Sequence, residues 1–350
     1  MEIRNIKLKN FRNHRQFQES FTNNLNVIIG PNGSGKSSII EAIALLASTK
    51  SFRSANFRNL IYEGLDYALS EGELSDKKLR IIISNNGKQF YCDQTAIKSS
   101  SDFIGLFQAI VFTSADLLFV NDPPKTRRRF IDSELSKINR YYLLKLSEYN
   151  ILLKNRNALL KGDKIDEALL DVFDSSMSEL MAEIWQLKQE YILDINKHFT
   201  QKLQNLLSEK AFVKLKYNSS CQELNKEEIK EQLINYRMRD ILSKQTNFGI
   251  HRDDYQINFN DHPAQDYCSS GQIRLIMLAL KLTLVELVQE KTKEKPVILL
   301  DDVLSELDLQ HQKKLLDLVC KDNQTIITTT HLESLLKEMD KKVIELKRRD

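Results

Sequence analysis

The sequence predicts an α/β fold, a mixed sheet with flanking helices, interrupted by a mainly helical insertion. Three observations lead to this prediction. An apolar run from Leu25 to Ile29 is followed by a glycine-rich loop and then a helical pattern. A second apolar run, from Val297 to Leu300, ends in two aspartates. Between these regions, from Lys125 to about Ser243, the apolar residues recur at helical spacing.

The loop after the first apolar run matches the phosphate-loop pattern G-x-x-x-x-G-K-[ST] in a strand–loop–helix context. Its glycines let backbone N–H groups surround an anion, and a helix N-terminus favours negative charge. Lys36 can reach the β- and γ-phosphates of a nucleotide, and Ser37 can ligate Mg²⁺. A chance match in a glycine- and serine-rich turn is the alternative, which the flanking strand and helix disfavour. The predicted nucleotide contacts are Gly30, Pro31, Asn32, Gly33, Ser34, Gly35, Lys36, Ser37 and Ser38.

The acidic end of the second apolar run completes this prediction. A strand covered on both faces forms a continuous apolar run, and ligands bind at the carboxyl ends of parallel strands. We therefore expect Asp301 to hold the Mg²⁺ that Ser37 also contacts. Asp302, one residue further on, can orient or deprotonate the attacking water. Alone, such a run is often only a polar strand end, but with the phosphate loop it predicts a nucleoside-triphosphate site.

Composition restricts the class of protein. The chain has 350 residues, of which 41% are hydrophobic and 28% charged, which is typical of a globular protein with two domains or lobes. Its apolar runs are shorter than the roughly 20 residues of a membrane helix. The sequence begins directly with an alternating strand pattern, so we expect no signal peptide. Four scattered cysteines and a net charge of +3 favour a cytoplasmic protein with reduced thiols and only permit nucleic-acid binding.

The elements expected before the insertion are mostly strands. Asn85-Asn86-Gly87 predicts a hairpin turn between two of them. The expected strands, besides Leu25–Ile29, are Glu2–Leu8, Tyr67–Leu74, Lys78–Ser84, Gln89–Asp93 and Gln108–Thr113.

The insertion predicts long helices. Arg140–Leu160 is expected to be a helix, with Gly162 as its C-cap and Asp163 as the next N-cap. The helical pattern continues over Ile165–Leu207, where a capping-box sequence at Ser176-Met177-Ser178-Glu179 leaves a break open. A strand, Ala211–Tyr217, and a helix, Ile229–Ser243, follow.

Strands and helices alternate again in the last part of the chain. The expected strands are Tyr255–Phe259, Val297–Leu300, Thr325–Thr329 and Val343–Leu346, and the expected helices are Gly271–Glu290 and Asp308–Val319. The nucleotide site therefore draws on both ends of the chain. We predict one lobe from residues 1–114 and 245–350 and a helical lobe from 115–244.

Three further motifs indicate which class of nucleotide-binding protein this is. Ser269-Ser270-Gly271-Gln272 opens a helix and offers a second anion site, although the same residues also make an ordinary N-cap. It resembles the signature of ABC-type ATPases, which binds the γ-phosphate held by the other protomer. Ser305-Glu306-Leu307-Asp308 resembles the D-loop of that superfamily, which makes Asp308 a candidate nucleotide contact. His331 follows the next strand, where the superfamily places a switch histidine, and an incidental histidine is the alternative.

Longer runs narrow the resemblance to one family across essentially the whole chain. The runs are Asn10-Phe11-Arg12-Asn13, Ser51-Phe52-Arg53, Arg127-Arg128-Arg129-Phe130-Ile131-Asp132, His251-Arg252-Asp253-Asp254 and Leu300 to Asp308. Together they resemble the RecF family of bacterial recombinational-repair ATPases, which are related to SMC heads. No glutamine follows the Gln108–Thr113 strand, where ABC ATPases keep one that senses Mg²⁺.

The resemblance implies an ABC/SMC-head-like phosphate-loop ATPase core and a helical lobe without a long coiled coil. ATP and Mg²⁺ would join two protomers, each donating Ser269 to Gln272 to the other's phosphate loop. The homodimer would clamp DNA at gaps or at junctions of duplex and single strand. With RecO and RecR it would support RecA loading, replication and the SOS response. Slow, DNA-dependent hydrolysis would release it, with Asp302 and His331 as the catalytic candidates.

Other interpretations stay open at this point. Arg12, Arg53 and Arg252 are candidates for nucleotide or DNA contact, or are ordinary surface or ion-paired arginines. The ATPase subunit of an ABC-type transporter is the alternative function, which the long insertion disfavours. An SMC-type chromosome organiser lacks support, because the insertion has no two coil-length arms. An ATP-binding switch with negligible turnover is compatible with Asp302, since the superfamily's usual base is the longer Glu.

Overall fold

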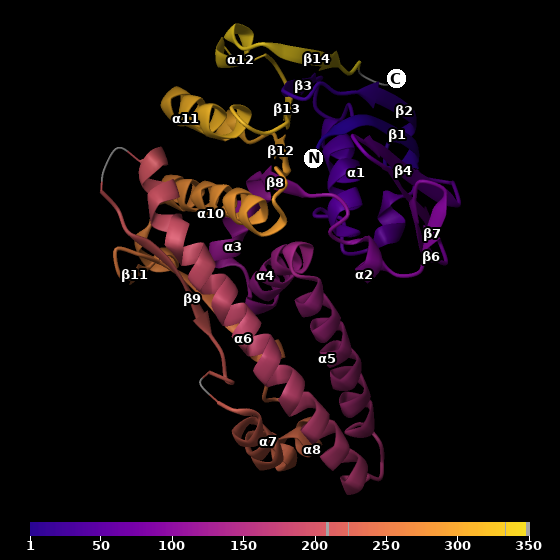
Figure 1. Cartoon of the computed structure of the whole chain (residues 1–350), viewed down its shortest axis with the longest axis vertical. Helices are drawn as coiled ribbons and strands as arrows, with labels where there is room; N and C mark the ends of the chain where they lie inside the picture. Colours follow the sequence, from indigo (N-terminus) through magenta and orange to yellow (C-terminus); the bar gives the residue numbers. More distant parts are fainter. Residues whose placement is uncertain (208–209, 223, 333, 348–350) are drawn as a thin grey trace. The chain divides into compact units, whose positions relative to one another are not determined.

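The computed structural model describes residues 1–207, 210–222, 224–332 and 334–347 (Figure 1). The chain forms two compact units. The first unit comprises Met1–Leu117, Lys202–Lys210 and Arg274–Asp350. The second comprises Leu118–Gln201 and Ala211–Ile273.

A five-stranded parallel sheet organises the first unit. Its strand order is β14-β3-β13-β12-β8, and every neighbouring pair is parallel. Because all strands point the same way, the loops after β3 and β12 leave the sheet at the same edge. The strands are β3 (Leu25–Ile29), β8 (Ala109–Thr113), β12 (Val297–Asp301), β13 (Thr325–Thr329) and β14 (Lys341–Glu345).

A second, six-stranded sheet of the same unit is antiparallel, with the order β2-β1-β4-β5-β6-β7. Inward residues of β1, β4 and β5 alternate with outward ones, as expected for a sheet with one solvated face. Its strands are β1 (Ile3–Phe11), β2 (His14–Ser20), β4 (Tyr67–Leu74), β5 (Lys78–Ser84), β6 (Gly87–Cys92) and β7 (Thr95–Ile97).

Helix α1 (Lys36–Ser48) contacts strands of both sheets. Its residues from Ser38 to Ala47 are all buried, which explains an almost continuous apolar sequence. One hydrophobic core includes side chains of α1 and of both sheets. The helix that carries the phosphate loop is thereby fixed in the centre of its unit.

Helices α1 and α11 (Leu309–Cys320) flank the parallel sheet (Figure 1), whereas α2 (Ser100–Phe103) and η1 (Phe57–Leu60) contact strands of the antiparallel sheet. Figure 1 shows α11 and α1 on opposite sides of β12 and β13. Helix α10 (Ser270–Thr292) begins in the second unit and continues in the first from Arg274. Other short helices are η2 (Ser114–Leu117), η4 (Leu304–Glu306) and α12 (Ser334–Glu338).

The second unit is mainly helical, with one small sheet of order β11-β10-β9. The strands are β9 (Val213–Asn218), β10 (Asp254–Phe259) and β11 (His262–Pro263). The helices are α3 (Leu118–Asn121), α4 (Pro124–Ile138), α5 (Arg140–Leu159), α6 (Glu167–Leu206), α7 (Lys226–Asn235), α8 (Arg237–Ser243), η3 (Ile250–Arg252) and α9 (Ala264–Tyr267).

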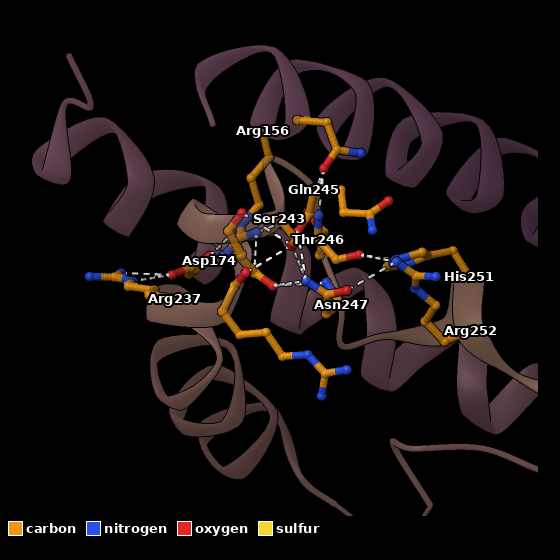
Figure 2. A network of polar contacts seen from close by, with 12 residues as sticks. Arg156, Asp174, Arg237, Ser243, Gln245, Thr246, Asn247, His251 and Arg252 are labelled. Carbon is orange, nitrogen blue, oxygen red and sulfur yellow. Dashed lines mark hydrogen bonds and ion pairs between the residues drawn. The ribbon is translucent and has the colours of Figure 1, made fainter. Parts of the chain in front are cut away.

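Helices α5 and α6 run antiparallel, because Lys145 pairs with Glu183 and Arg156 pairs with Asp174. Arg156 lies in a buried network that also joins α8 and the chain after it (Figure 2). Its guanidinium donates to Asp174 at 2.8 Å, Asp240 at 2.7 Å and Thr246 at 2.9 Å. Three helices are thus tied together by one arginine.

Side chains of α6 cover the edge strand β9. Asn196 donates to the Leu215 carbonyl at 2.9 Å and accepts from its N–H at 2.8 Å. One turn later, Thr200 bonds the N–H and C=O of Val213. Because these backbone groups are paired, this part of the edge offers little to an additional strand.

The α/β fold is confirmed, with the parallel and antiparallel strands in separate sheets. Each strand expected from the sequence is present with small shifts at its ends. The two-residue turn at Asn85 and Asn86 is also confirmed, since Ser84 pairs with Gly87. Strands β2, β7 and β11 were not predicted, because their largely exposed sequences carry little apolar alternation.

The long helix expected over Ile165–Leu207 is confirmed, whereas two other predictions about the insertion were wrong. Helix α6 runs unbroken through Ser176 for 40 residues, since packing of its apolar face outweighs the local capping sequence. The expected Ile229–Ser243 helix is two helices that meet at Tyr236. Gly162 and Asp163 are not caps: α5 ends at Leu159 with Leu160 as its C-cap, and the Asp166 side chain accepts from the Leu169 N–H near the start of α6.

The compact units follow limits different from the predicted lobes, 1–114 with 245–350 and 115–244. Residues 245–273 lie in the second unit because β10 pairs with β9. Residues 202–210 lie in the first unit. Among the helices of the described ranges, none has the length and apolar character needed to cross a membrane.

Candidate nucleotide-binding site

The phosphate loop links β3 to α1. Gly33 and Gly35 have φ values of +82° and +99°, which only glycine adopts readily. A side chain on Gly30 would meet Ser34 Oγ at 2.7 Å and the Leu346 carbonyl at 2.8 Å. These glycines let the backbone make a tight turn directly before the helix N-terminus.

Two polar side chains of the loop face its interior. The Lys36 ammonium donates to the carbonyls of Gly30 at 2.6 Å and Pro31 at 3.1 Å. Ser34 Oγ is buried without a hydrogen-bond partner in the described part of the chain. A bound anion would give both groups an acceptor, so the donors of the loop fit a phosphate.

The two aspartates lie at the carboxyl end of β12: Asp301 is its last residue and Asp302 follows it. Thr328 of β13, fully buried, donates to Asp301 Oδ1 at 2.8 Å and accepts from the Asp302 N–H at 3.1 Å. Asp302 has a φ of +55°, the left-handed region that Asp and Asn tolerate better than Glu does. The backbone after β12 is therefore suited to the aspartate found there.

A pocket of about 580 Å³ brings part of the predicted site together. The phosphate loop and Asp302 form one part of its lining, although they are far apart in sequence. Arg12, Arg53 and Tyr62 belong to another part. The full lining is Arg12, Asn13, Asn32, Gly33, Gly35, Lys36, Ser37, Ser38, Arg53, Asn59, Ile61, Tyr62, Glu63 and Asp302.

Glu41 of α1 is a buried carboxylate beside this pocket that sequence reasoning missed. The Arg12 guanidinium donates two hydrogen bonds to this carboxylate, of 2.8 and 2.6 Å, and the Ser51 hydroxyl also donates to it. Arg53 approaches it at 3.7 Å while remaining 46% exposed. Of the two candidate arginines that line this pocket, Arg12 is therefore engaged in an ion pair, whereas the Arg53 side chain remains largely exposed at the pocket surface.

The signature-like segment forms a capping box at the start of α10, in the second unit. Ser269 Oγ accepts from the Gln272 N–H at 3.2 Å, and the Gln272 side chain accepts from the Ser269 N–H at 2.9 Å. Ser269, Ser270 and Gly271 are exposed, and Gln272 is half-buried. The N-cap interpretation is correct for the single chain and leaves a second role for this surface open.

The D-loop-like segment, Ser305 to Asp308, is bound by a side chain of α10 and caps the N-terminus of α11. Arg274 donates to the Glu306 carbonyl at 2.6 Å and pairs with its carboxylate at 3.2 Å. Asp308 caps α11 and binds His311 Nδ1 at 2.6 Å, and these hydrogen bonds lower the pKa of Asp308. His331 lies just after β13, next to Thr330, and is not part of the pocket lining.

The His251 to Asp254 run is mostly engaged within the second unit. Arg127 binds Asp254 with two hydrogen bonds, of 2.8 and 2.7 Å, and Arg128 donates to the Asp253 carbonyl. The buried Asp253 carboxylate accepts from Tyr217 and Ser219. Arg252 is the exposed member of the run.

The parallel sheet, the phosphate loop after β3 and the aspartates after β12 define a phosphate-loop protein of the ATPase class. A family model described as "RecF/RecN/SMC N terminal domain" matches residues 2–111. A protein of Oenococcus oeni named "DNA replication and repair protein RecF" is 34% identical over 367 residues, covering 99% of this chain and 98% of the relative. The chain belongs to the RecF family.

Solved structures agree with this assignment. One described as "Structure of the recombination mediator protein RecF-ATP in RecFOR pathway" has a TM-score of 0.90 and 30% identity. It covers 97% of this chain and 93% of the other. A Pyrococcus furiosus Smc head domain, with a TM-score of 0.53 and 17% identity over 94% and 89% of the two chains, shares the fold.

Proposed function

We propose that the chain is an ATPase that binds DNA in recombinational repair, using ATP to join two protomers into a clamp. One observation carries this proposal: Lys36, Ser37 and Asp302 line one pocket. Membership of the RecF family supports the role in DNA replication and repair. The family assignment also disfavours a transporter subunit.

The nucleotide would lie with its phosphates against the loop from Gly30 to Ser38. Lys36 would exchange its two carbonyl partners for phosphate oxygens, and backbone N–H groups at the start of α1 would hold the same charge. The pocket extends to Ile61 and Tyr62, which offer an apolar surface for the base.

Ser37 and Asp301 supply the hard oxygen ligands that Mg²⁺ prefers. When bound there, Mg²⁺ would neutralise charge on the phosphate oxygens. Asp302 would orient the attacking water and accept its proton. His331 is proposed to sense the γ-phosphate from the end of β13.

Two exposed segments are proposed to serve the neighbouring protomer. Ser269, Ser270, Gly271 and Gln272 would contact the γ-phosphate bound by the other chain, and Asp308 would lie near the same interface. The dimer would bind DNA at gaps or duplex–single-strand junctions and act with RecO and RecR to load RecA. It would take part in replication and the SOS response, and slow, DNA-stimulated hydrolysis would release it in the cytoplasm.

Sedimentation velocity tests the proposal directly. We expect the wild-type protein to sediment as a dimer with MgATP and as a monomer without it, and gapped DNA to co-sediment only with the dimer. Lys36→Ala should remain a monomer at all ATP concentrations, because the phosphates lose their fixed cation. Dimerisation of Lys36→Ala with unchanged ATP affinity would refute the site.

A further inference from the structure

The turn between β1 and β2 lies directly against the phosphate loop. Asn13 Nδ2 donates to the Gly33 carbonyl at 3.2 Å, and His14 Nε2 lies 3.0 Å from the Gly35 carbonyl. Because a carbonyl only accepts, Nε2 of His14 carries the hydrogen of this bond. A side chain on Gly35 would approach His14 Nε2 to 2.3 Å, so the contact itself requires glycine there.

These contacts determine where the loop's N–H groups point. In a trans peptide the C=O and the following N–H point in opposite directions. The Gly35 carbonyl also accepts from the Ser38 and Ile39 N–H groups of α1, at 3.0 and 3.3 Å. These bonds and the contact with His14 together direct the Lys36 N–H away from the carbonyl, at the N-terminus of α1. That N–H has no acceptor within the helix and belongs to the set that binds anions.

The loop needs such support because its own conformation is permissive. Gly33 and Gly35 both have positive φ, and glycine exchanges readily between such conformations and others. The Ser34 N–H closes the turn on the Pro31 carbonyl at 3.2 Å, while the Gly33 carbonyl of the same peptide is held by Asn13. Each anchored carbonyl thus removes one peptide rotation from the loop.

The turn that provides these donors is itself fixed. Arg12 binds Glu41 in the middle of α1, and its N–H donates to the Leu60 carbonyl at 2.8 Å. His14 is 1% exposed and packs on Phe17 with a ring separation of 5.2 Å. The β1–β2 turn therefore contacts α1 at both its N-cap, Gly35, and its interior, Glu41.

We infer that His14 and Asn13 are positioning residues that preorganise the phosphate loop for the phosphates of a nucleotide. The inference rests on the proposed function, since it concerns the same site. It assigns to the β1–β2 turn the task of holding the Lys36 N–H ready before ligand binds. Neither side chain needs to contact the nucleotide for this task.

Two substitutions of His14 distinguish the effect of its hydrogen bond to the phosphate loop from the effect of its ring packing. His14→Phe keeps the ring and removes the donor, whereas His14→Gln keeps an N–H donor. We expect His14→Phe to raise the Kd for ATP about five- to tenfold, as for one lost hydrogen bond, and to leave the Kd for adenosine unchanged. His14→Gln should restore ATP affinity to within about threefold of wild type. His262→Phe, at an exposed histidine, is the matched control and should change neither Kd.

Amide hydrogen exchange gives a readout that needs no nucleotide. Without ligand, the peptide covering residues 30–37 should exchange faster in His14→Phe and in Asn13→Ala than in wild type. The inference is overturned if exchange is unchanged in both variants, if His14→Gln behaves as His14→Phe, or if ATP and adenosine lose affinity equally. A wild-type protein that binds no ATP would instead refute the proposed function, and the exchange rates would still decide whether the turn holds the loop.

Discussion

Thr328 contacts the two adjacent aspartates in different ways. Its hydroxyl holds the Asp301 carboxylate but only the backbone of Asp302. Asp302 then turns in the left-handed region and reaches the pocket that Lys36 also lines. One carboxylate is thus fixed by the sheet, and the next remains available to the pocket.

The first prediction follows from this difference. Asp301→Asn should weaken MgATP binding, because a metal ligand loses its charge. Asp302→Asn should preserve binding and slow hydrolysis by about 10²- to 10⁴-fold, the usual effect of losing a general base. Asp322→Asn, at an exposed aspartate, serves as the control. The measurement is the nucleotide affinity and the turnover rate of the three variants. Equal losses of ATP affinity in Asp301→Asn and Asp302→Asn would exclude separate roles.

His251 carries a second prediction at this scale. Burial lowers its pKa to about 4, and the neighbouring Arg252, Arg128 and Arg156 act in the same direction. Tyr149 donates to Nδ1 at 2.6 Å, and Nε2 faces the Thr246 carbonyl, which suits the neutral ring. In the unfolded chain its pKa is near 6.5, so the unfolded state binds more protons between pH 6.5 and 4.

Stability is therefore lost as the pH falls through this window. At pH 5 His251 should lower the free energy of unfolding by about 2 kcal/mol relative to pH 7.5. His251→Asn should be less stable at pH 7.5 and lose less between the two pH values, while His262→Asn should follow wild type. Urea unfolding at both pH values measures this, and parallel losses in His251→Asn and wild type would contradict it.

The sequence predicted the residues whose proposed roles depend on a local motif. Gly30 to Ser38 and Asp301 stand in recognisable order next to apolar strands. The contributions of Asn13, His14, Glu41 and Thr328 come from tertiary contacts with chain segments that lie 20 to 29 positions away. No spacing rule reports such contacts, so these residues required the structure.

At the scale of elements, packing decided where local signals were ambiguous. Apolar periodicity predicted α5, α6 and α10, whereas exposed strands such as β2 left no pattern. The polar network around Arg156 was invisible in sequence, although it explains how α5, α6 and α8 are joined (Figure 2). Arg237 adds to it by binding Asp171 and Asp174 from α8.

The third prediction concerns this network. Arg156→Met should destabilise the protein by about 3–5 kcal/mol, because it leaves Asp174 and Asp240 without their buried partner. Asp174 retains Arg237, so most of the loss is expected at Asp240. Arg239→Met, at an exposed arginine of α8, is the matched control and should stay within about 0.5 kcal/mol of wild type. Urea unfolding monitors both, and equal stabilities would show that the network contributes little.

For the whole molecule, the notable feature is that both chain ends build the unit with the phosphate loop. β3 lies between β13 and β14, so the strand that leads into the phosphate loop pairs on both sides with C-terminal strands. The helical unit, inserted between them, ends in the first turn of α10. The phosphate loop and the Ser269–Gln272 segment therefore belong to different units of one chain.

The last prediction tests whether that segment acts on a second protomer. Ser269→Arg should leave ATP binding by the monomer intact and block dimerisation, because the bulky side chain occupies the docking surface. Loss of the capping box costs about 0.5–2 kcal/mol, and Ser269→Ala controls for it, since alanine removes the cap without adding bulk. Mixed with Lys36→Ala, which keeps an intact Ser269 but a defective phosphate loop, Ser269→Arg should form heterodimers with one complete composite site. Sedimentation with ATP should then detect dimers in the mixture and not in either variant alone. Loss of ATP binding by Ser269→Arg on its own would mean that the segment serves the phosphate loop of its own chain.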